Sequence, residues 1–142
     1  MPDARCNYVG GEWVAARSGE TFEQRNPAAL SEVTGRYPAS SADDARRAVD
    51  AAASARAGWR DTPPTARATI LRRAHEHIGD RKDALAEMLT RENGKTLVES
   101  RGEIDYALDD MGFQIGEGLR LYGETVPSSL PGVLAYTVRE PV

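Results

Sequence analysis

The sequence predicts a mixed α/β fold, with a small β region at the N-terminus followed by amphipathic helices. Three observations support this prediction: two β-type runs flank a Gly-Gly pair near the start, apolar residues recur at helical spacing from residue 41 to about residue 122, and a short β-type run returns near residue 133. The chain has 142 residues, 40% hydrophobic and 28% charged, which is typical of a globular protein. Its length suits one domain.

The β region is predicted from turn-forming residues that separate extended runs. Gly10-Gly11 can adopt the positive φ angles of a tight hairpin, and Asn26-Pro27 turns the chain because proline keeps the preceding asparagine out of the helical region. Hairpins of this size are marginally stable alone, so we expect the β region to pack on a larger body. The expected strands are residues 7–9, 12–14, a piece around 21–23, and 32–37.

Four helices are expected after residue 41. Ser41 followed by Asp44 is typical of a capped helix start, and the alanine-rich helix that follows is expected to end at Gly58-Trp59. Pro63-Pro64 then breaks the chain, and a later helix is expected to stop at Gly94. The second and third helices are predicted over residues 65–79 and 81–93. The last begins near residue 97 and carries a stripe of Ile104, Leu108, Met111, Ile115, Leu119 and Tyr122.

Two glycine motifs imitate phosphate-binding sequences. Gly94-Lys95-Thr96 resembles the end of a phosphate-binding loop, but that motif needs a glycine at position 89, which is Leu89. Gly116 and Gly118 resemble the start of a dinucleotide fingerprint, but the third glycine position is Leu121, and the pattern is helical. Neither motif is predicted to bind phosphate.

Other chemistry-bearing side chains are interpreted as structural. His75 and His77 point about 200° apart on a helix and are not expected to chelate one metal. Cys6 has no activating neighbour in sequence, and Trp13 and Trp59 are interpreted as packing anchors. The acids are interpreted as solvated helix faces: Glu87, Glu92, Glu99, Glu103, Asp105, Asp109 and Asp110. We therefore expect no catalytic and no cofactor-binding residue in this chain.

Charge and hydropathy exclude two classes of partner. The net charge of −4 at pH 7 gives no broad basic field for nucleic acid. No apolar run approaches the roughly 20 residues that cross a bilayer, and no secretory signal is recognisable. One cysteine cannot form an internal disulfide, which is consistent with a reducing compartment, so we expect a cytoplasmic protein.

Local signatures follow one another along the chain in a characteristic order. They are Tyr8-Val9-Gly10-Gly11-Glu12-Trp13, Asn26-Pro27-Ala28, Ser41-Ala42-Asp43-Asp44, Trp59, Arg67 with Ile70-Leu71, the run from Leu89 to Lys95, the run from Gly123 to Pro127, and Arg139-Glu140-Pro141-Val142. This order resembles the N-terminal part of an NAD(P)-dependent aldehyde dehydrogenase. Thr96 departs from the pattern, because many relatives carry proline there. The local sequence is most similar in character to that of 2-oxoglutarate semialdehyde dehydrogenases. Succinate semialdehyde and simple aliphatic or betaine aldehydes are the alternative substrates.

The resemblance implies that this chain supplies the N-terminal β-hairpin segment and the α-helices of a dinucleotide-binding, Rossmann-like α/β domain that is incomplete here. Residues 1–130 would belong to the cofactor-binding domain, and residues 131–142 would start an oligomerisation arm. The full-length enzyme would oxidise an aldehyde, a semialdehyde by texture, to a carboxylic acid with NAD or NADP. Its catalytic cysteine, glutamate and asparagine are expected beyond residue 142, so this chain alone is expected to be inactive and to hold no cofactor.

The resemblance also implies a cation site and several partners. Some relatives hold a monovalent cation through backbone carbonyls and one acid, which correspond to Gln24-Arg25 and Glu92 here; the plain alternative is a helix-terminal acid. The expected partners are the remainder of the enzyme chain, a small aldehyde, and a second copy that pairs through residues 134–138, from Leu134 to Val138. The alternative function is a non-catalytic helical module that binds a partner.

Overall fold

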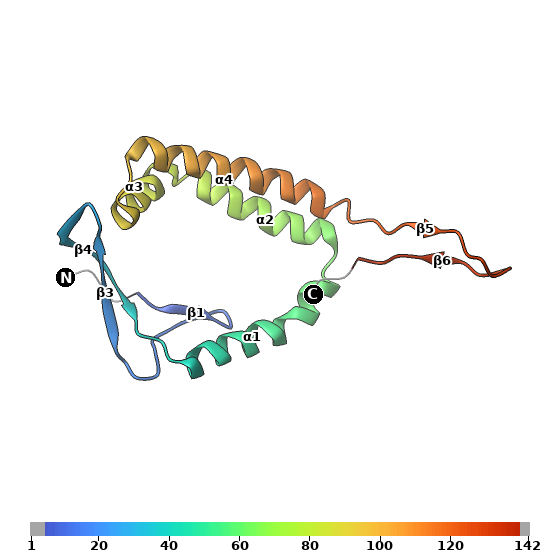
Figure 1. Ribbon diagram of the computed structural model, residues 1–142, viewed down its shortest axis with the longest axis horizontal. Coiled ribbons are helices and arrows are strands. Elements are labelled where there is room, and N and C mark those ends of the chain that lie inside the picture. The colour runs from blue at the N-terminus through green and yellow to red at the C-terminus, as the bar shows by residue number, and fades with distance from the viewer. Residues whose placement is uncertain (1–4, 140–142) are drawn as a thin grey trace.

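The computed structural model describes residues 5–139, which form four helices and three two-stranded antiparallel sheets. Helices α2, α3 and α4 form one layer, and β3–β4 connects that layer to the side that carries α1 and β1–β2 (Figure 1). The mixed α/β prediction is confirmed. The elements are β1 (Asn7–Val9), β2 (Glu12–Val14), β3 (Thr21–Asn26), β4 (Ala29–Pro38), α1 (Ala42–Asp61), α2 (Pro64–Gly79), α3 (Lys82–Asn93), α4 (Leu97–Gly118), β5 (Thr125–Val126) and β6 (Ala135–Tyr136).

The first hairpin is confirmed. Gly10 and Gly11 have φ angles of 62° and 91°, as the tight turn between β1 and β2 requires. Tyr8 lies opposite Trp13, and their ring centroids are 5.0 Å apart. Trp13, which was interpreted as a packing anchor, thus packs against Tyr8, and it remains 72% exposed among the described residues.

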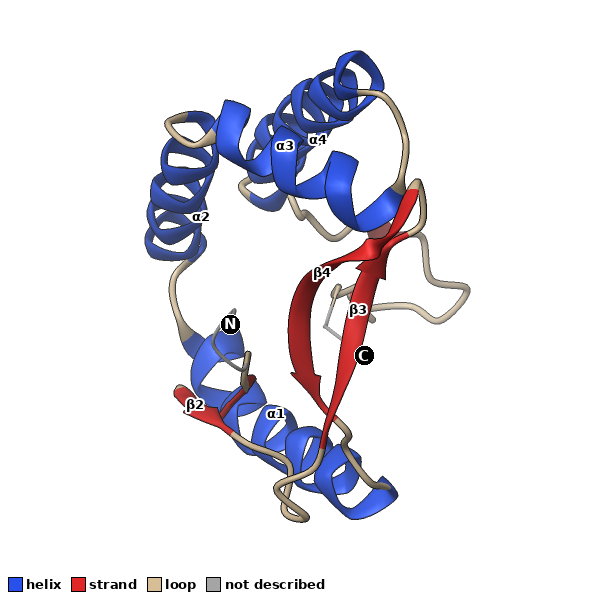
Figure 2. Cartoon of the chain, turned by 90° about the vertical axis from the view of Figure 1, so that its left-hand side faces the viewer, coloured by secondary structure: helices blue, strands red, loops and turns tan. Residues whose placement is uncertain are grey.

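The second hairpin is longer than predicted. Strands β3 and β4 pair from Thr21 opposite Pro38 to Asn26 opposite Ala29, with register shifts after Gln24. The Asn26 side chain organises the turn, since its Oδ1 accepts a hydrogen bond of 2.9 Å from the backbone N–H of Ala28. The hairpin thereby reaches from α1 to the end of α3 (Figure 2).

Helix α1 begins where predicted but ends later. Ser41 and Asp44 form a reciprocal capping box. The helix continues through Gly58 and Trp59 to Asp61, so the expected end at Gly58-Trp59 is wrong. Thr62 is extended, with ψ of 128°, because the proline that follows disfavours a helical conformation in the preceding residue.

Helices α3 and α4 meet at a sharp turn. Gly94 has φ of 80° and ends α3 as predicted, and Thr96 forms a capping box with Glu99 at the start of α4. Ser100 is fully buried, and its hydroxyl lies 2.7 Å from that of Thr90. Helix α4 ends at Gly118, so the last two residues of the predicted stripe, Leu119 and Tyr122, lie outside the helix.

The apolar core of the described residues is small. Its buried members are Ala16, Ala68, Ala86 and Ile115, while Tyr106 is 75% exposed. Alanines bury little area, so this core contributes little hydrophobic stabilisation. Large apolar side chains on every layer of the described residues remain exposed to solvent. None of the helices within residues 5–139 has the length and hydropathy needed to cross a bilayer.

The last two strands form a ribbon that projects from the end of α4 (Figure 1). Thr125 pairs with Tyr136, and Val126 pairs with Ala135. The predicted β-type run near residue 133 is therefore a strand only at residues 135–136, and it has a partner that precedes it in the chain. Residues 140–142, which complete the last signature, lie outside the described part of the chain.

Candidate functional site

A hollow of about 390 Å³ lies between the second hairpin and the end of α3. Strand β3 supplies Phe22 and Gln24, strand β4 supplies Tyr37, and helix α3 supplies Leu89, Glu92 and Asn93. The register places Phe22 opposite Tyr37, and their ring centroids are 6.0 Å apart. The two rings form an apolar wall beside the carboxylate of Glu92.

Glu92 is held by a hydrogen bond across 55 residues of sequence. The Tyr37 hydroxyl donates to Oε1 of Glu92 at 2.7 Å, and both residues are partly buried. This hydrogen bond, together with burial and the negative charge of Glu92, raises the pKa of Tyr37 above its ordinary value. The interaction orients the carboxylate of Glu92 at the hollow.

The predicted cation ligands are partly brought together. Gln24 and Glu92 line the same hollow, whereas Arg25 is not among its described lining residues. The backbone carbonyl of Gln24 accepts a hydrogen bond from Thr34 Oγ1 at 3.2 Å, and a carbonyl oxygen has a second lone pair. A carbonyl and a carboxylate are oxygen ligands, which hard cations prefer.

A second acid reinforces this corner of the fold. Glu32 accepts hydrogen bonds from Asn26 Nδ2 at 2.8 Å and from Arg91 Nε at 2.6 Å. These two interactions lower the pKa of Glu32, the contact with Asn26 being the larger cause. Glu32 therefore joins the hairpin turn to the last turn of α3, next to Glu92.

The other metal and nucleophile candidates lie apart. His75 is partly buried, with Nε2 3.1 Å from the Leu108 carbonyl oxygen, while His77 is exposed on the same helix. Cys6 is a free, partly buried thiol. Within residues 5–139, no three His, Cys, Asp or Glu side chains gather as a metal cluster.

The two phosphate-like motifs lie in positions that do not form a phosphate cradle. Lys95 forms an ion pair with Glu103, and Thr96 caps α4, so the Gly-Lys-Thr run connects two helices. Gly116 and Gly118 belong to α4. A dinucleotide site needs a strand, a glycine-rich turn and a helix in succession, and the described residues do not supply that arrangement.

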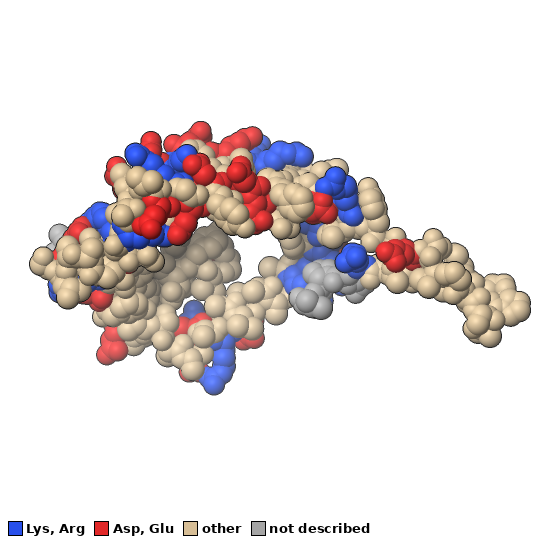
Figure 3. Space-filling model, turned by 45° about the horizontal axis from the view of Figure 1, so that its top comes forward, with Lys and Arg blue, Asp and Glu red and all other residues tan. Residues whose placement is uncertain are grey.

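The acidic side chains gather over the layer of α2, α3 and α4, interspersed with basic ones (Figure 3). Arg101 pairs with Asp83 at 3.0 Å, and Lys82 pairs with Asp105. Exposed pairs of this kind contribute little stability each. Most of the predicted helix acids are exposed, and Glu92 differs from them because it is partly buried.

Sequence reasoning identified Glu92 and Gln24 but missed Phe22, Tyr37 and Asn93 at the hollow. Phe22 and Tyr37 are ordinary strand residues in the sequence pattern. Their proximity to α3 depends on long-range packing, and no local motif encodes it.

The comparisons with known proteins identify the family. The sequence pattern described as "Aldehyde dehydrogenase family" matches residues 13–142. The chain belongs to the aldehyde dehydrogenase family.

The relatives are semialdehyde and aldehyde dehydrogenases. The chain is 44% identical over 142 residues to the alpha-ketoglutarate semialdehyde dehydrogenase of Haloferax volcanii, covering 100% of this chain and 30% of the relative. It is 37% identical to the NADP(+) succinate-semialdehyde dehydrogenase GabD of Escherichia coli, covering 94% and 28%. The crystal structure of an NAD-dependent aldehyde dehydrogenase from Sinorhizobium meliloti matches with a TM-score of 0.92 and 31% identity, covering 99% and 28%. The chain thus spans about 30% of the length of the curated relatives that it matches.

Proposed function

We propose that this chain is the N-terminal portion of a longer NAD(P)-dependent aldehyde dehydrogenase that oxidises a semialdehyde to a carboxylic acid. The family match over residues 13–142 carries this proposal. The name of the Haloferax volcanii relative supports 2-oxoglutarate semialdehyde as the first substrate to test. Succinate semialdehyde is second, after the Escherichia coli relative.

The chain's own role in this proposal is that of a scaffold. Its small core and exposed apolar side chains support the idea that further polypeptide covers the helices. Residues 1–130 would belong to the cofactor-binding domain and residues 131–142 to an oligomerisation arm. Leu134, which is 74% exposed and directly precedes β6, would contribute to strand pairing with a second copy.

The reactive groups in this proposal lie on the remainder of the enzyme. NAD or NADP accepts the hydride in this chemistry, and the residues that hold it would lie on the remainder of the enzyme. The names of the relatives support both cofactors, since one relative uses NADP(+) and one solved neighbour is NAD-dependent.

Glu92 is our proposed ligand for a monovalent cation, together with the Gln24 carbonyl. The oxygen chemistry and the common hollow support this role. In the long enzyme, potassium should raise the melting temperature relative to an equal concentration of a bulky organic cation. Glu92→Ala should remove that difference, and Glu87→Ala, an exposed acid on the same helix, should retain it. An equal potassium effect in Glu92→Ala argues against the site.

The function is tested by measuring reduced nicotinamide formation. The longest polypeptide that the gene encodes should oxidise 2-oxoglutarate semialdehyde with NAD or NADP, and should be compared on succinate semialdehyde and betaine aldehyde. Residues 1–142 alone should show no aldehyde oxidation. Formation of reduced cofactor by residues 1–142, abolished by Cys6→Ser, would overturn the proposal.

A further inference from the structure

A second hollow, separate from the Glu92 site, lies where four elements approach one another. Its volume is about 520 Å³, and it lies between the end of α1, the start of α2, the end of α4 and the segment after β6. The described lining residues include three arginines and no acid: they are Arg60, Pro64, Arg67, Gly118, Leu119, Leu121, Val138 and Arg139.

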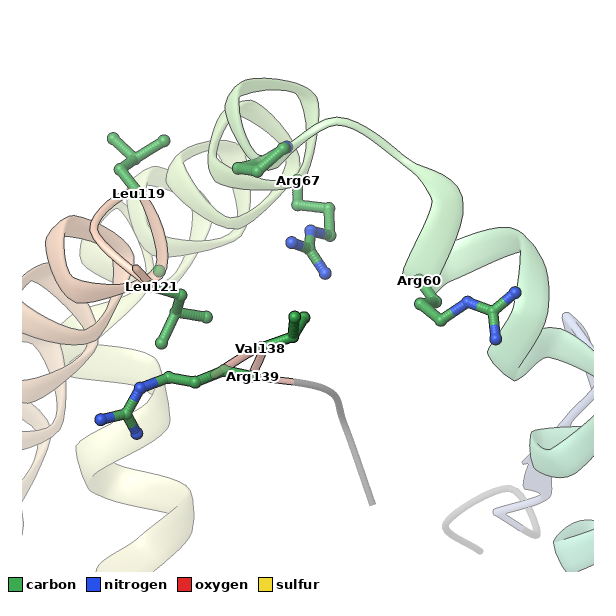
Figure 4. Close-up of a pocket in the computed structure, with 8 residues that line it drawn as sticks. Arg60, Arg67, Leu119, Leu121, Val138 and Arg139 are labelled. Carbon is green, nitrogen blue, oxygen red and sulfur yellow. The ribbon is translucent and has the colours of Figure 1, made fainter. Parts of the chain in front are cut away.

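Arg67 is the residue aimed into this hollow. Its side chain leaves α2 and points toward Val138, with Leu119 and Leu121 on one side (Figure 4). Arg60 and Arg139 extend away from that space (Figure 4). Arg67 is partly buried, and no hydrogen bond or ion pair joins its side chain to another residue of 5–139. Removing a guanidinium from water without a partner costs free energy.

The local field favours an anion. Helix α2 begins at Pro64 without a side-chain cap and without an acid in its first turn, so the positive end of its dipole adds to the charge of Arg67. Two carboxylates at the ends of the neighbouring helices are already engaged, because Asp61 pairs with Arg60 and Glu117 pairs with Arg120.

We propose that the hollow at Arg67 is a carboxylate-binding site. A guanidinium presents a fork of N–H donors that matches the two oxygens of a carboxylate. The apolar walls formed by Leu119, Leu121 and Val138 suit the hydrocarbon that adjoins a carboxylate, and suit a fully hydrated phosphate poorly. The carboxylate comes either from an acidic side chain of this protein or from a free small molecule, and the experiment separates the two.

The main test compares Arg67→Met with Arg72→Met by urea denaturation of the longest polypeptide that the gene encodes. Arg72 is a matched control, because it is exposed on the same helix. At pH 7, Arg67→Met should raise the unfolding equilibrium constant roughly tenfold to a hundredfold, while Arg72→Met should change it by about twofold or less. Arg67→Lys should fall between wild type and Arg67→Met, since lysine keeps the charge and loses the fork.

The pH profile identifies the bound group. A carboxylate beside Arg67 has a lowered pKa in the folded state, so its contribution is present at neutral pH and disappears as pH falls through that lowered pKa. The difference between wild type and Arg67→Met should therefore vanish on acidification. If Arg67→Met fails to fold, the same profile is measured for Arg67→Lys. A difference that is independent of pH, an equal effect in Arg72→Met, or no effect at Arg67 would overturn the proposal.

Two further arms identify the source. Glu140 follows Arg139 in the sequence and lies outside the described residues. If Glu140→Gln lowers the stability as much as Arg67→Met does, and the two substitutions together lower it no further, Glu140 is the source of the carboxylate. If the loss in Arg67→Met appears only when acetate is added, the source is a free carboxylate. A pH-dependent loss with neither signature assigns an acid elsewhere in the protein. Each of these results supports a carboxylate at Arg67. Aldehyde oxidation, which tests the proposed function, is measured in a separate assay.

Discussion

The hydroxyl of Tyr37 joins β4 to the last turn of α3 through Glu92. Because a charged acceptor strengthens this hydrogen bond, Tyr37→Phe should lower the free energy of unfolding by about 1 kcal/mol. Chemical denaturation measures this change. Phe22→Leu on the same wall keeps the hydrogen bond and should leave the titration of Tyr37 near its wild-type position. An unchanged stability in Tyr37→Phe would show that the bond is not formed in solution.

The same pair makes a pH prediction. The pKa of Tyr37 is raised, chiefly by the hydrogen bond to Glu92, so its stabilising effect is complete below the unfolded value of about 10 and is lost as pH rises through the folded pKa. Ultraviolet titration of the phenol measures this pKa. Glu92→Gln should move it down toward the ordinary value, and a shift in the opposite direction would contradict the assignment.

Gly94 has both a special conformation and a close neighbour. Its φ is 80°, and a Cβ built there would lie 3.1 Å from Cγ of Pro27 and 3.2 Å from the backbone nitrogen of Ala28. Gly94→Ala should therefore destabilise the protein by about 1 to 2 kcal/mol. Gly58→Ala is the control, since Gly58 lies inside α1 with open space around it. It should stabilise the protein by up to about 1 kcal/mol. Equal effects of the two substitutions would contradict this account.

At the scale of elements, the capping boxes explain where two helices begin. Thr96 accepts a hydrogen bond from the Glu99 N–H, and the Glu99 carboxylate accepts one from the Thr96 N–H at 3.0 Å. The Thr96 hydroxyl also donates a hydrogen bond of 2.8 Å to this carboxylate, and the hydroxyl and the backbone N–H of Thr96, in that order of importance, lower the pKa of Glu99. Thr96→Ala should therefore lower stability by about 1 kcal/mol. Thr69→Ala is the control, because Thr69 lies inside α2 and its hydroxyl bonds to a carbonyl of its own helix. Denaturation midpoints that coincide for the two variants would argue against the cap.

Local signals predicted the elements better than their ends. Ser41 with Asp44 and Gly94 act within a few residues, so the sequence identifies them directly. The end of α1 was misplaced because a helix tolerates Gly58 at modest cost, and the proline after Thr62 imposes the stop instead. The pairing of β5 with β6 was missed because Thr125–Val126 is too short to show a strand pattern.

At the scale of the molecule, the described residues enclose little of their own apolar surface. The isolated 142-residue chain should therefore self-associate, which sedimentation velocity at several concentrations would measure. Leu134→Ser on the ribbon should weaken this association if strand pairing drives it. Asp110→Ser is exposed on α4 and should not weaken it. A sharp melting transition of a monomer, independent of concentration, would contradict the prediction.

The sequence predicted the candidate site only in part. Glu92 and Gln24 were identified through the family resemblance, and the structure places both at one hollow. Tyr37 and Arg67 acquire their importance from contacts or spaces formed by segments distant in the chain, as the 55-residue separation of Tyr37 and Glu92 shows. Patterns in a single sequence report local conformation. Contacts between segments that are distant in the chain form only when the layers assemble.

The two capping boxes have a consequence for the order of folding. Each is completed within four consecutive residues, so α1 and α4 can nucleate before any distant segment has arrived. Helix formation should thus precede the fixed packing of side chains. During gradual denaturation, far-ultraviolet circular dichroism should persist after the aromatic signals of Tyr37 and Phe22 have gone.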